Sequence, residues 1–90
     1  MTEHKRSRYN EEIASLDAIV GNHRGGSPSE TADICAFVGE KLGAARSALE
    51  RDDEEAAWVS MYGAASFCRA SRIQPDQAGL ALTRIKLLLS

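Results

Sequence analysis

An all-α fold of about four helices is predicted by three observations. Apolar residues recur at steps of three and four along four separate stretches, which is the period of an amphipathic helix. Capping residues, glycines and prolines lie between these stretches. No stretch alternates apolar and polar residues as a half-buried strand does. Short connections make sequential helices antiparallel neighbours, so we expect a small antiparallel bundle or an orthogonal array, completed by homo-oligomerisation.

Length and composition predict one small domain. The chain has 90 residues, 43% hydrophobic and 27% charged, with a net charge of −2, which is typical of a globular protein with a small core. The charge is uneven, and we expect residues 1–8 to form a basic, flexible N-terminal arm before a single helical domain at 9–90. No segment resembles a signal peptide or is long enough to span a bilayer. We therefore expect a cytoplasmic protein without membrane contact.

The first helix is expected from near Asn10 to Val20. Its stripe of apolar residues consists of Tyr9, Ile13, Leu16 and Ile19 with Val20. Gly21 follows, and a glycine can end a helix in the left-handed conformation without steric cost.

The second helix is expected to begin after Ser27. Ser27, Pro28 and Glu30 match a capping box, with proline at the first helical position, where no amide donor is needed. The predicted buried stripe is Ile34, Val38, Leu42, Ala45 and Leu49.

The connection between the second and third helices is predicted from phase. Trp58 follows Leu49 by nine residues, which at 100° each places the two side chains on opposite sides of one helix. Asp52 with Glu55 resembles a capping box with an acidic cap. We favour a break at Asp52 and Asp53, with one long helix as the alternative.

The third and fourth helices carry two further apolar stripes. Those of the third helix are Trp58, Met61, Tyr62, Ala65 and Cys68, and the small residues from Gly63 to Ser66 permit close packing. Pro75 can start the fourth helix, whose inner stripe is Ala78, Leu82, Ile85 and Leu89, widened by Leu80, Leu87 and Leu88. This apolar face exceeds what a four-helix monomer needs, and a homodimer would cover it.

The stretch NHRGGSP at 22–28 is the first candidate for a ligand site. Its glycines and Arg24 could hold a phosphate at a helix N-terminus. However, it lacks the lysine of a Walker loop and a preceding strand, and Ser27 and Glu30 already serve as caps. We interpret it as a capped loop whose polar tip, Asn22, His23 and Arg24, contacts a partner.

Catalysis is not expected. The acidic residues at 52–55 are consecutive, so they do not converge as a general acid and base would. Cys35 and Cys68 lack metal-ligand spacing and a neighbouring histidine, and we expect both to be reduced, small core residues. The sequence predicts no metal and no cofactor.

The leading functional hypothesis is a helical interaction protein that binds and modulates a partner macromolecule as a regulator, inhibitor or adaptor. Trp58 and Tyr62 lie one turn apart, and Arg69 and Arg72 follow them. Aromatic residues and arginines dominate interface energetics, so these four residues are candidates for contact with a protein partner. The alternative for Trp58 is a role as anchor of the small core.

Two other functions remain open from the sequence. Residues 31–51 resemble a helix-turn-helix with a glycine at the turn, Gly39, although Glu40 stands where that turn buries an aliphatic residue. In that alternative a DNA-binding regulator would contact nucleic acid through Lys41, Arg46 and Arg51. The other alternative is a binder of a small anionic ligand, such as a nucleotide, at a subunit interface with Arg24, Arg69 and Arg72.

Overall fold

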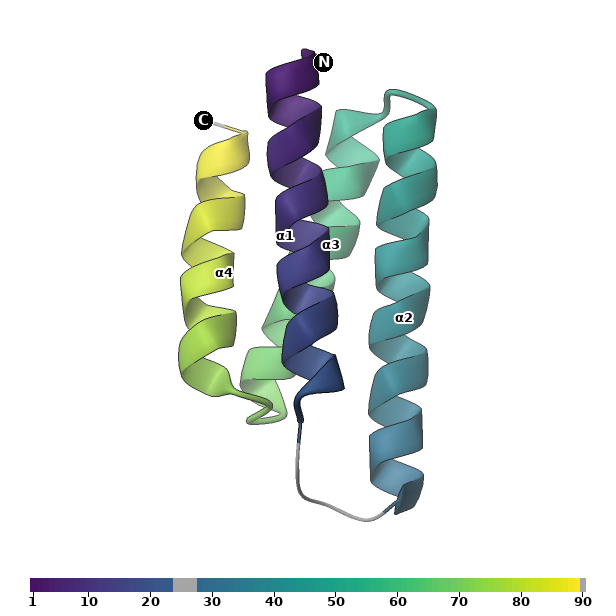
Figure 1. The fold of residues 1–90 in the computed structure, drawn as a ribbon, viewed down its shortest axis with the longest axis vertical. Coiled ribbons are helices and arrows are strands. Elements are labelled where there is room, and N and C mark those ends of the chain that lie inside the picture. The colour runs from purple at the N-terminus through teal and green to yellow at the C-terminus, as the bar shows by residue number, and fades with distance from the viewer. Residues whose placement is uncertain (24–27, 90) are drawn as a thin grey trace.

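The computed structural model describes residues 1–23 and 28–89, with the backbone alone at Pro28 and Ser29. This part of the chain forms helices α1 (Glu3–Gly21), α2 (Pro28–Glu50), α3 (Glu54–Ala70) and α4 (Pro75–Leu88), without a strand. Consecutive helices run antiparallel, as predicted for a bundle (Figure 1). None of the helices in the described residues combines the length and apolar character required of a membrane span.

The bundle is flattened because one pair of diagonally opposed helices is close together and the other pair is far apart. α1 and α3 contact each other, and each also contacts α2 and α4, whereas α2 and α4 do not touch in the described chain. In Figure 1, α1 lies in front of α3, with α4 and α2 on either side. The principal extents are therefore 41 × 22 × 16 Å. α1 and α3 lie on opposite broad faces of the molecule.

The helix α1 begins earlier than the sequence predicted. We expected a start near Asn10, after a flexible arm, but residues 3–8 form the first turns of α1. The side chain of Thr2 caps this helix by accepting a hydrogen bond from the Lys5 amide at 3.1 Å. Arg6 then donates to the Leu49 carbonyl and pairs with Asp52. Polar contacts thus stabilise residues 3–8 as a helix. These residues carry no apolar stripe, so periodicity could not predict them.

The end of α1 also differs from the prediction. Gly21 is the last helical residue, and its φ is not in the left-handed region. Asn22 caps the helix with φ −96°, and its amide donates to the Ala18 carbonyl at 2.9 Å. The predicted cap at Ser27 lies outside the described residues.

The predicted break between α2 and α3 is confirmed. The Asp53 amide donates to the Ala48 carbonyl at 2.8 Å and the Asp52 amide to the Leu49 carbonyl at 3.1 Å, which is the hydrogen-bond pattern of a Schellman motif. Asp52 takes the left-handed conformation with φ 58°. The cap of α3 is Asp53, which accepts from the Ala56 amide at 3.2 Å, so the prediction of Asp52 as cap is off by one residue.

The turn between α3 and α4 repeats this motif. The Ile73 amide donates to the Cys68 carbonyl at 2.8 Å and the Arg72 amide to the Arg69 carbonyl at 3.1 Å, with Arg72 left-handed at φ 59°. Ile73 is fully buried, which closes the core beneath the turn. Gln74 donates from its side chain to the Ile19 carbonyl at 3.2 Å, so the turn is also tied to α1.

The core contains residues from all four helices. The predicted stripes of α1, α2 and α3 supply most of its large side chains, although Ile34 and Trp58 are only half-buried. In α4 the prediction was wrong by one position, because Leu88 is buried and Leu89 is exposed. The largest fully buried side chains are Tyr9, Ile13, Leu16, Leu42, Met61, Ile73 and Ile85.

Candidate functional site

Trp58 lies where α3 meets α4. Its indole Nε1 donates to the Ile85 carbonyl at 2.7 Å, and its ring stacks on Tyr62 with centroids 4.9 Å apart. Both aromatic side chains are half-buried. Trp58, predicted to contact a partner, therefore also links α3 to α4. The exposed parts of Trp58 and Tyr62 lie next to the outer side of α3.

The outer face of α3 is uncharged between its two ends. We define this face by Glu55, Val59, Tyr62, Gly63, Ser66 and Arg69. Apart from Gly63 these residues follow one another at steps of four, three, four and three, so they lie along one side of the helix. No charged residue occurs from Ala56 to Cys68. Val59, near the N-terminal end of the face, is 56% exposed.

Opposite charges mark the two ends of this face. Glu55 lies in the first turn of α3 and Arg69 in the last, which suits the helix dipole at both positions. Both side chains are exposed, and among the described residues neither has an ion-pair partner. The face thus has a negative end, an uncharged middle and a positive end.

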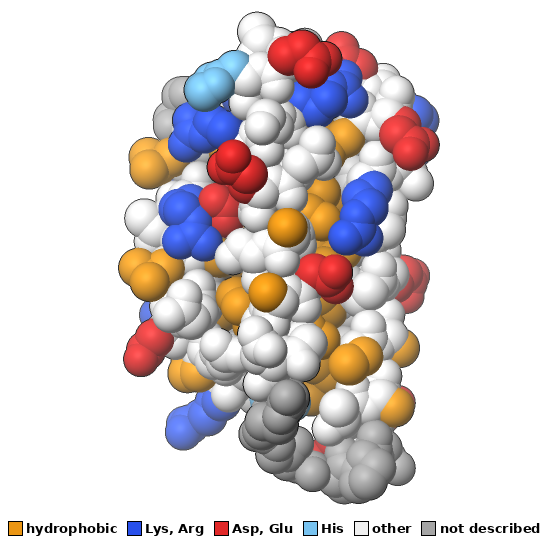
Figure 2. All heavy atoms as spheres, viewed as in Figure 1, with side chains coloured by type: hydrophobic (Ala, Val, Ile, Leu, Met, Phe, Trp, Pro, Cys, Tyr) orange, Lys and Arg blue, Asp and Glu red, His pale blue; other side chains and the backbone are white. Residues whose placement is uncertain are grey.

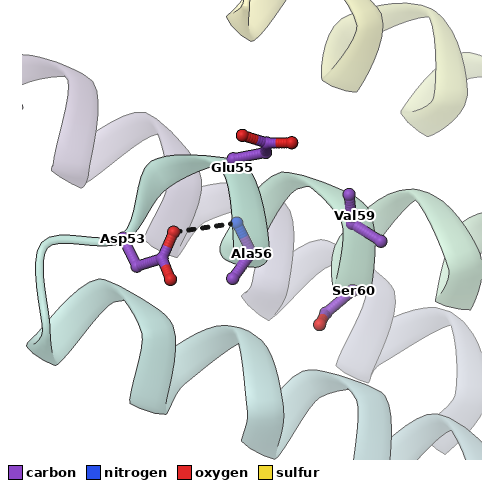
Figure 3. A pocket seen from close by; sticks show the side chains of 5 residues that line it. All are labelled: Asp53, Glu55, Ala56, Val59 and Ser60. Carbon is purple, nitrogen blue, oxygen red and sulfur yellow. Dashed lines mark hydrogen bonds between the residues drawn. The ribbon is translucent and has the colours of Figure 1, made fainter.

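An open hollow of about 430 Å³ lies beside the N-terminal half of this face (Figure 3). It is lined by Asp53, Glu55, Ala56, Val59 and Ser60. The Asp53 carboxylate is occupied as the helix cap, whereas Glu55 extends from the other side of the helix (Figure 3). The lining offers apolar surface next to negative charge, which suits an apolar group next to a cation.

An aromatic contact joins the same side of α3 to α2. The rings of Phe37 and Phe67 lie with centroids 4.3 Å apart, and the Lys41 ammonium lies 5.5 Å from the Phe37 ring centre. Phe37 is 38% exposed. Apolar surface therefore continues from the outer face of α3 onto the margin of α2.

The outer side of α4 carries exposed leucines. Leu80 is 55% and Leu87 59% exposed, and their spacing of seven residues corresponds to about two helical turns. Leu89 is 47% exposed at the C-terminal end. The surplus of apolar residues predicted for this helix is thus present at the surface, where these leucines form a second candidate interaction surface.

A polar cluster joins the N-terminal half of α1 to the first residue of α3. Lys5 Nζ lies 2.7 Å from Glu54 Oε2, and the Tyr9 hydroxyl donates to the same oxygen at 2.9 Å. The Lys5 hydrogen bond lowers the pKa of Glu54, with a further contribution from Tyr9. Burial raises the pKa of Tyr9 far above its ordinary value, and the Glu54 carboxylate raises it further. The cluster thus joins α1 to α3 through one carboxylate.

The helix-turn-helix interpretation of residues 31–51 is wrong in its geometry. Residues 31–50 lie within the uninterrupted helix α2, so Gly39 does not form a turn. Arg46 lies 3.9 Å from Asp17 of α1, and Lys41 lies over Phe37. Arg51 is exposed beyond the helix end. Of the residues that suggested the motif, Ala45 and Leu49 are buried in the core, whereas Cys35 and Gly39 are exposed.

The remaining candidates are dispersed. Asn22 is exposed and His23 half-buried, while Arg24 lies outside the described residues. Arg69 and Arg72 are both exposed at the C-terminal end of α3.

The two cysteines differ in their surroundings. Cys68 is buried, which raises the pKa of its thiol, but Cys35 is exposed, against the prediction, because it lies beside rather than on the inner stripe of α2. Within the described ranges no three His, Cys, Asp or Glu side chains gather as metal ligands would.

Sequence reasoning singled out Trp58 and Tyr62 for partner contact but not Val59, and it named Ser66 only among the small residues that permit close packing. The signal for these residues was present in the uncharged run from Ala56 to Cys68. Comparison with family models, curated proteins and solved structures finds no match to this chain.

Proposed function

We propose that this protein acts by binding and modulating a partner macromolecule, as a homo-oligomer and without catalysing a reaction. The observation that carries the proposal is the apolar surface on α4, where Leu80 and Leu87 are both more than half exposed on one line of the helix. Single exposed leucines are common in globular proteins, but two on one line form the kind of row that a partner covers.

The neighbouring side chains indicate what such a partner offers. Arg84 lies between the two leucines in sequence, and its guanidinium is turned to α1, where Nε donates to Glu12 at 2.8 and 3.1 Å. This charge is neutralised within the protein, so it adds little attraction for an acidic partner. A protein with an apolar groove fits α4 better than nucleic acid, since anchors two turns apart are how a helix enters such a groove.

Affinity capture from the native cell with mass spectrometry tests this proposal. The wild-type protein is compared with Leu80→Ser/Leu87→Ser, and the matched control is Ala14→Ser/Ala18→Ser, two exposed apolar positions on α1. We expect a protein that both the wild type and the control retain and that the leucine variant loses, with all three showing the same helical circular dichroism. Equal capture by the wild type and the leucine variant would contradict a role for α4.

A further inference from the structure

We propose that the protein forms a two-fold homodimer in which α3 packs antiparallel against α3 of a second copy, with the symmetry axis near Tyr62 and Gly63. This inference rests on the self-association in the proposed function and assigns a surface to it. It also separates two surfaces, because α3 would join the copies while the leucines of α4 would stay available to a different partner.

The charges of the outer face of α3 specify the antiparallel orientation. Glu55 and Arg69 each lie seven residues from Tyr62, so rotation about an axis at that position places each of them opposite the other residue of the second copy. The two ion pairs formed in this way are about 21 Å apart at 1.5 Å per residue. A parallel arrangement would instead place glutamate opposite glutamate and arginine opposite arginine. The face is therefore complementary to itself in one orientation only.

The middle of the face is suited to close contact between helices. Gly63 lies inside a helix, where glycine is less favourable than alanine by about 1 kcal/mol. A Cβ atom added at Gly63 would meet no atom within 4 Å, so packing within the chain does not require this glycine. In the proposed dimer a second helix crosses at Gly63, where the missing side chain lets two backbones approach. Ser66 and the exposed Val59 lie one turn on either side of this crossing.

The hollow beside the face is filled in the same arrangement. An antiparallel two-fold keeps the α2 side of one copy next to the α2 side of the other. Phe67, which contacts Phe37 on the α2 side of α3, then lies level with Ala56 and Ser60 of the second copy. The hollow would receive an aromatic ring next to Ala56 and an arginine, Arg69, next to Glu55. Both groups match its lining.

The opposite broad face of the bundle does not offer these features. The side that carries α1 displays acidic and basic side chains over much of its surface, most densely toward the N-terminal end of α1 (Figure 2). Several of them are engaged with neighbouring helices, as Lys5 is with Glu54 and Arg84 with Glu12. Covering that face would remove water from these charges.

Sedimentation equilibrium of charge variants tests the arrangement. Glu55→Arg alone and Arg69→Glu alone each replace both ion pairs of the dimer with repulsive pairs, so each should raise the dissociation constant about tenfold or more. An equal mixture of the two variants forms heterodimers in which both pairs are attractive, and it should return to wild-type affinity. Glu11→Arg and Arg8→Glu on α1 make the same charge changes on the opposite face and should leave the constant unchanged.

A second pair of variants tests the close contact independently of charge. Gly63→Leu and Gly39→Leu both replace a helical glycine with nothing within 4 Å of the added Cβ, and both improve helix propensity. We expect Gly63→Leu to raise the dissociation constant about tenfold or more and Gly39→Leu to have no effect, with both variants folded by circular dichroism.

Each other outcome overturns a defined part of the proposal. Single charge variants that associate as the wild type does would rule out the antiparallel α3 interface, while the homo-oligomer itself would stand. Equal effects of Gly63→Leu and Gly39→Leu would rule out the crossing at Gly63. A wild-type protein that stays monomeric at millimolar concentration would overturn both this interface and the homo-oligomer of the proposed function.

Discussion

The helices α1 and α3 occupy equivalent places in the bundle but differ in their outer surfaces. Each contacts the other three helices, and each lies on one broad face of the molecule. The outer side of α1 carries acidic and basic residues such as Glu3, Arg8, Glu11 and Asp17, whereas α3 has no charged residue from Ala56 to Cys68. This difference in composition is the one that the proposed α3 interface would require.

The two helices are also held by different forces. Ion pairs connect α1 to every other helix, through Asp17 to α2, Lys5 to α3 and Glu12 to α4. The helix α3 is held by buried small residues, among them Ala57, Ala64 and Ala65, and by the hydrogen bond from Trp58 to α4. These small buried residues let α3 pack closely against its neighbours.

Truncating one apolar side chain on α1 and one on α3 should give the largest difference in the free energy of unfolding. Leu16 of α1 is fully buried, so Leu16→Ala should lower the free energy of unfolding by about 2–5 kcal/mol, through lost burial and a cavity. Val59 of α3 is mostly exposed, and Val59→Ala should change the free energy of unfolding by less than about 0.5 kcal/mol in dilute solution. Urea denaturation monitored by circular dichroism measures both. A large loss for Val59→Ala in the dilute monomer would mean that this side chain already packs within the chain.

The contact between Tyr9 and Glu54 should make the attachment of α1 to α3 sensitive to alkaline pH. Burial, with the hydrogen bond to Glu54, raises the pKa of the folded phenol above its ordinary value of 10.0. The raised pKa contributes its full stabilisation below pH 10. This stabilisation is lost as the pH rises further, because the Tyr9 phenol then loses its proton in the unfolded chain before it does in the folded protein. The free energy of unfolding should fall by up to about 1.4 kcal/mol per pH unit in this range.

The variant Tyr9→Phe isolates this effect. At pH 7 it should be less stable than the wild type by about 1 kcal/mol, since the Tyr9 hydrogen bond to Glu54 is lost. Above pH 10 the difference should shrink, because phenylalanine has no proton to release while all other groups titrate equally in both proteins. Urea denaturation between pH 7 and 11 measures both. Curves that stay parallel to pH 11 would show that the phenol is not protected in the folded state.

The sequence predicted the fold more completely than the ends of its helices. Periodicity located four helices, and the phase difference between Leu49 and Trp58 located the break between α2 and α3, because a buried stripe must keep facing one core. The start of α1 was missed because Lys5 and Arg6 hold it through polar contacts to residues more than forty positions away. Apolar periodicity detects residues that are buried. Lys5 and Arg6 are held in place by polar contacts although they are only half-buried.

The candidate surface was only partly predictable for a related reason. Sequence reasoning placed Trp58 and Tyr62 among residues for a partner, yet the Trp58 indole is used to bind the Ile85 carbonyl. Which side of α3 faces outward depends on how α2 and α4 are placed around it, and that is a property of the tertiary structure. The same holds for α4, where the wide apolar face left the choice between Leu88 and Leu89 open until its neighbours were placed.

Substitutions in the two turns that flank α3 should have the smallest effects on the free energy of unfolding. Both turns also contact α1. Asp52 and Arg72 are both left-handed, which disfavours side chains other than glycine. Arg72→Gly should therefore raise the free energy of unfolding by about 1 kcal/mol, whereas Arg72→Ala keeps its Cβ and should gain less than about 0.5 kcal/mol. Asp52→Gly should gain less than Arg72→Gly, because Asp52 also pairs with Arg6 of α1 at 3.1 Å. Urea denaturation at neutral pH measures all three, and equal gains for the glycine and alanine variants at position 72 would show that the left-handed backbone is not the source of the instability.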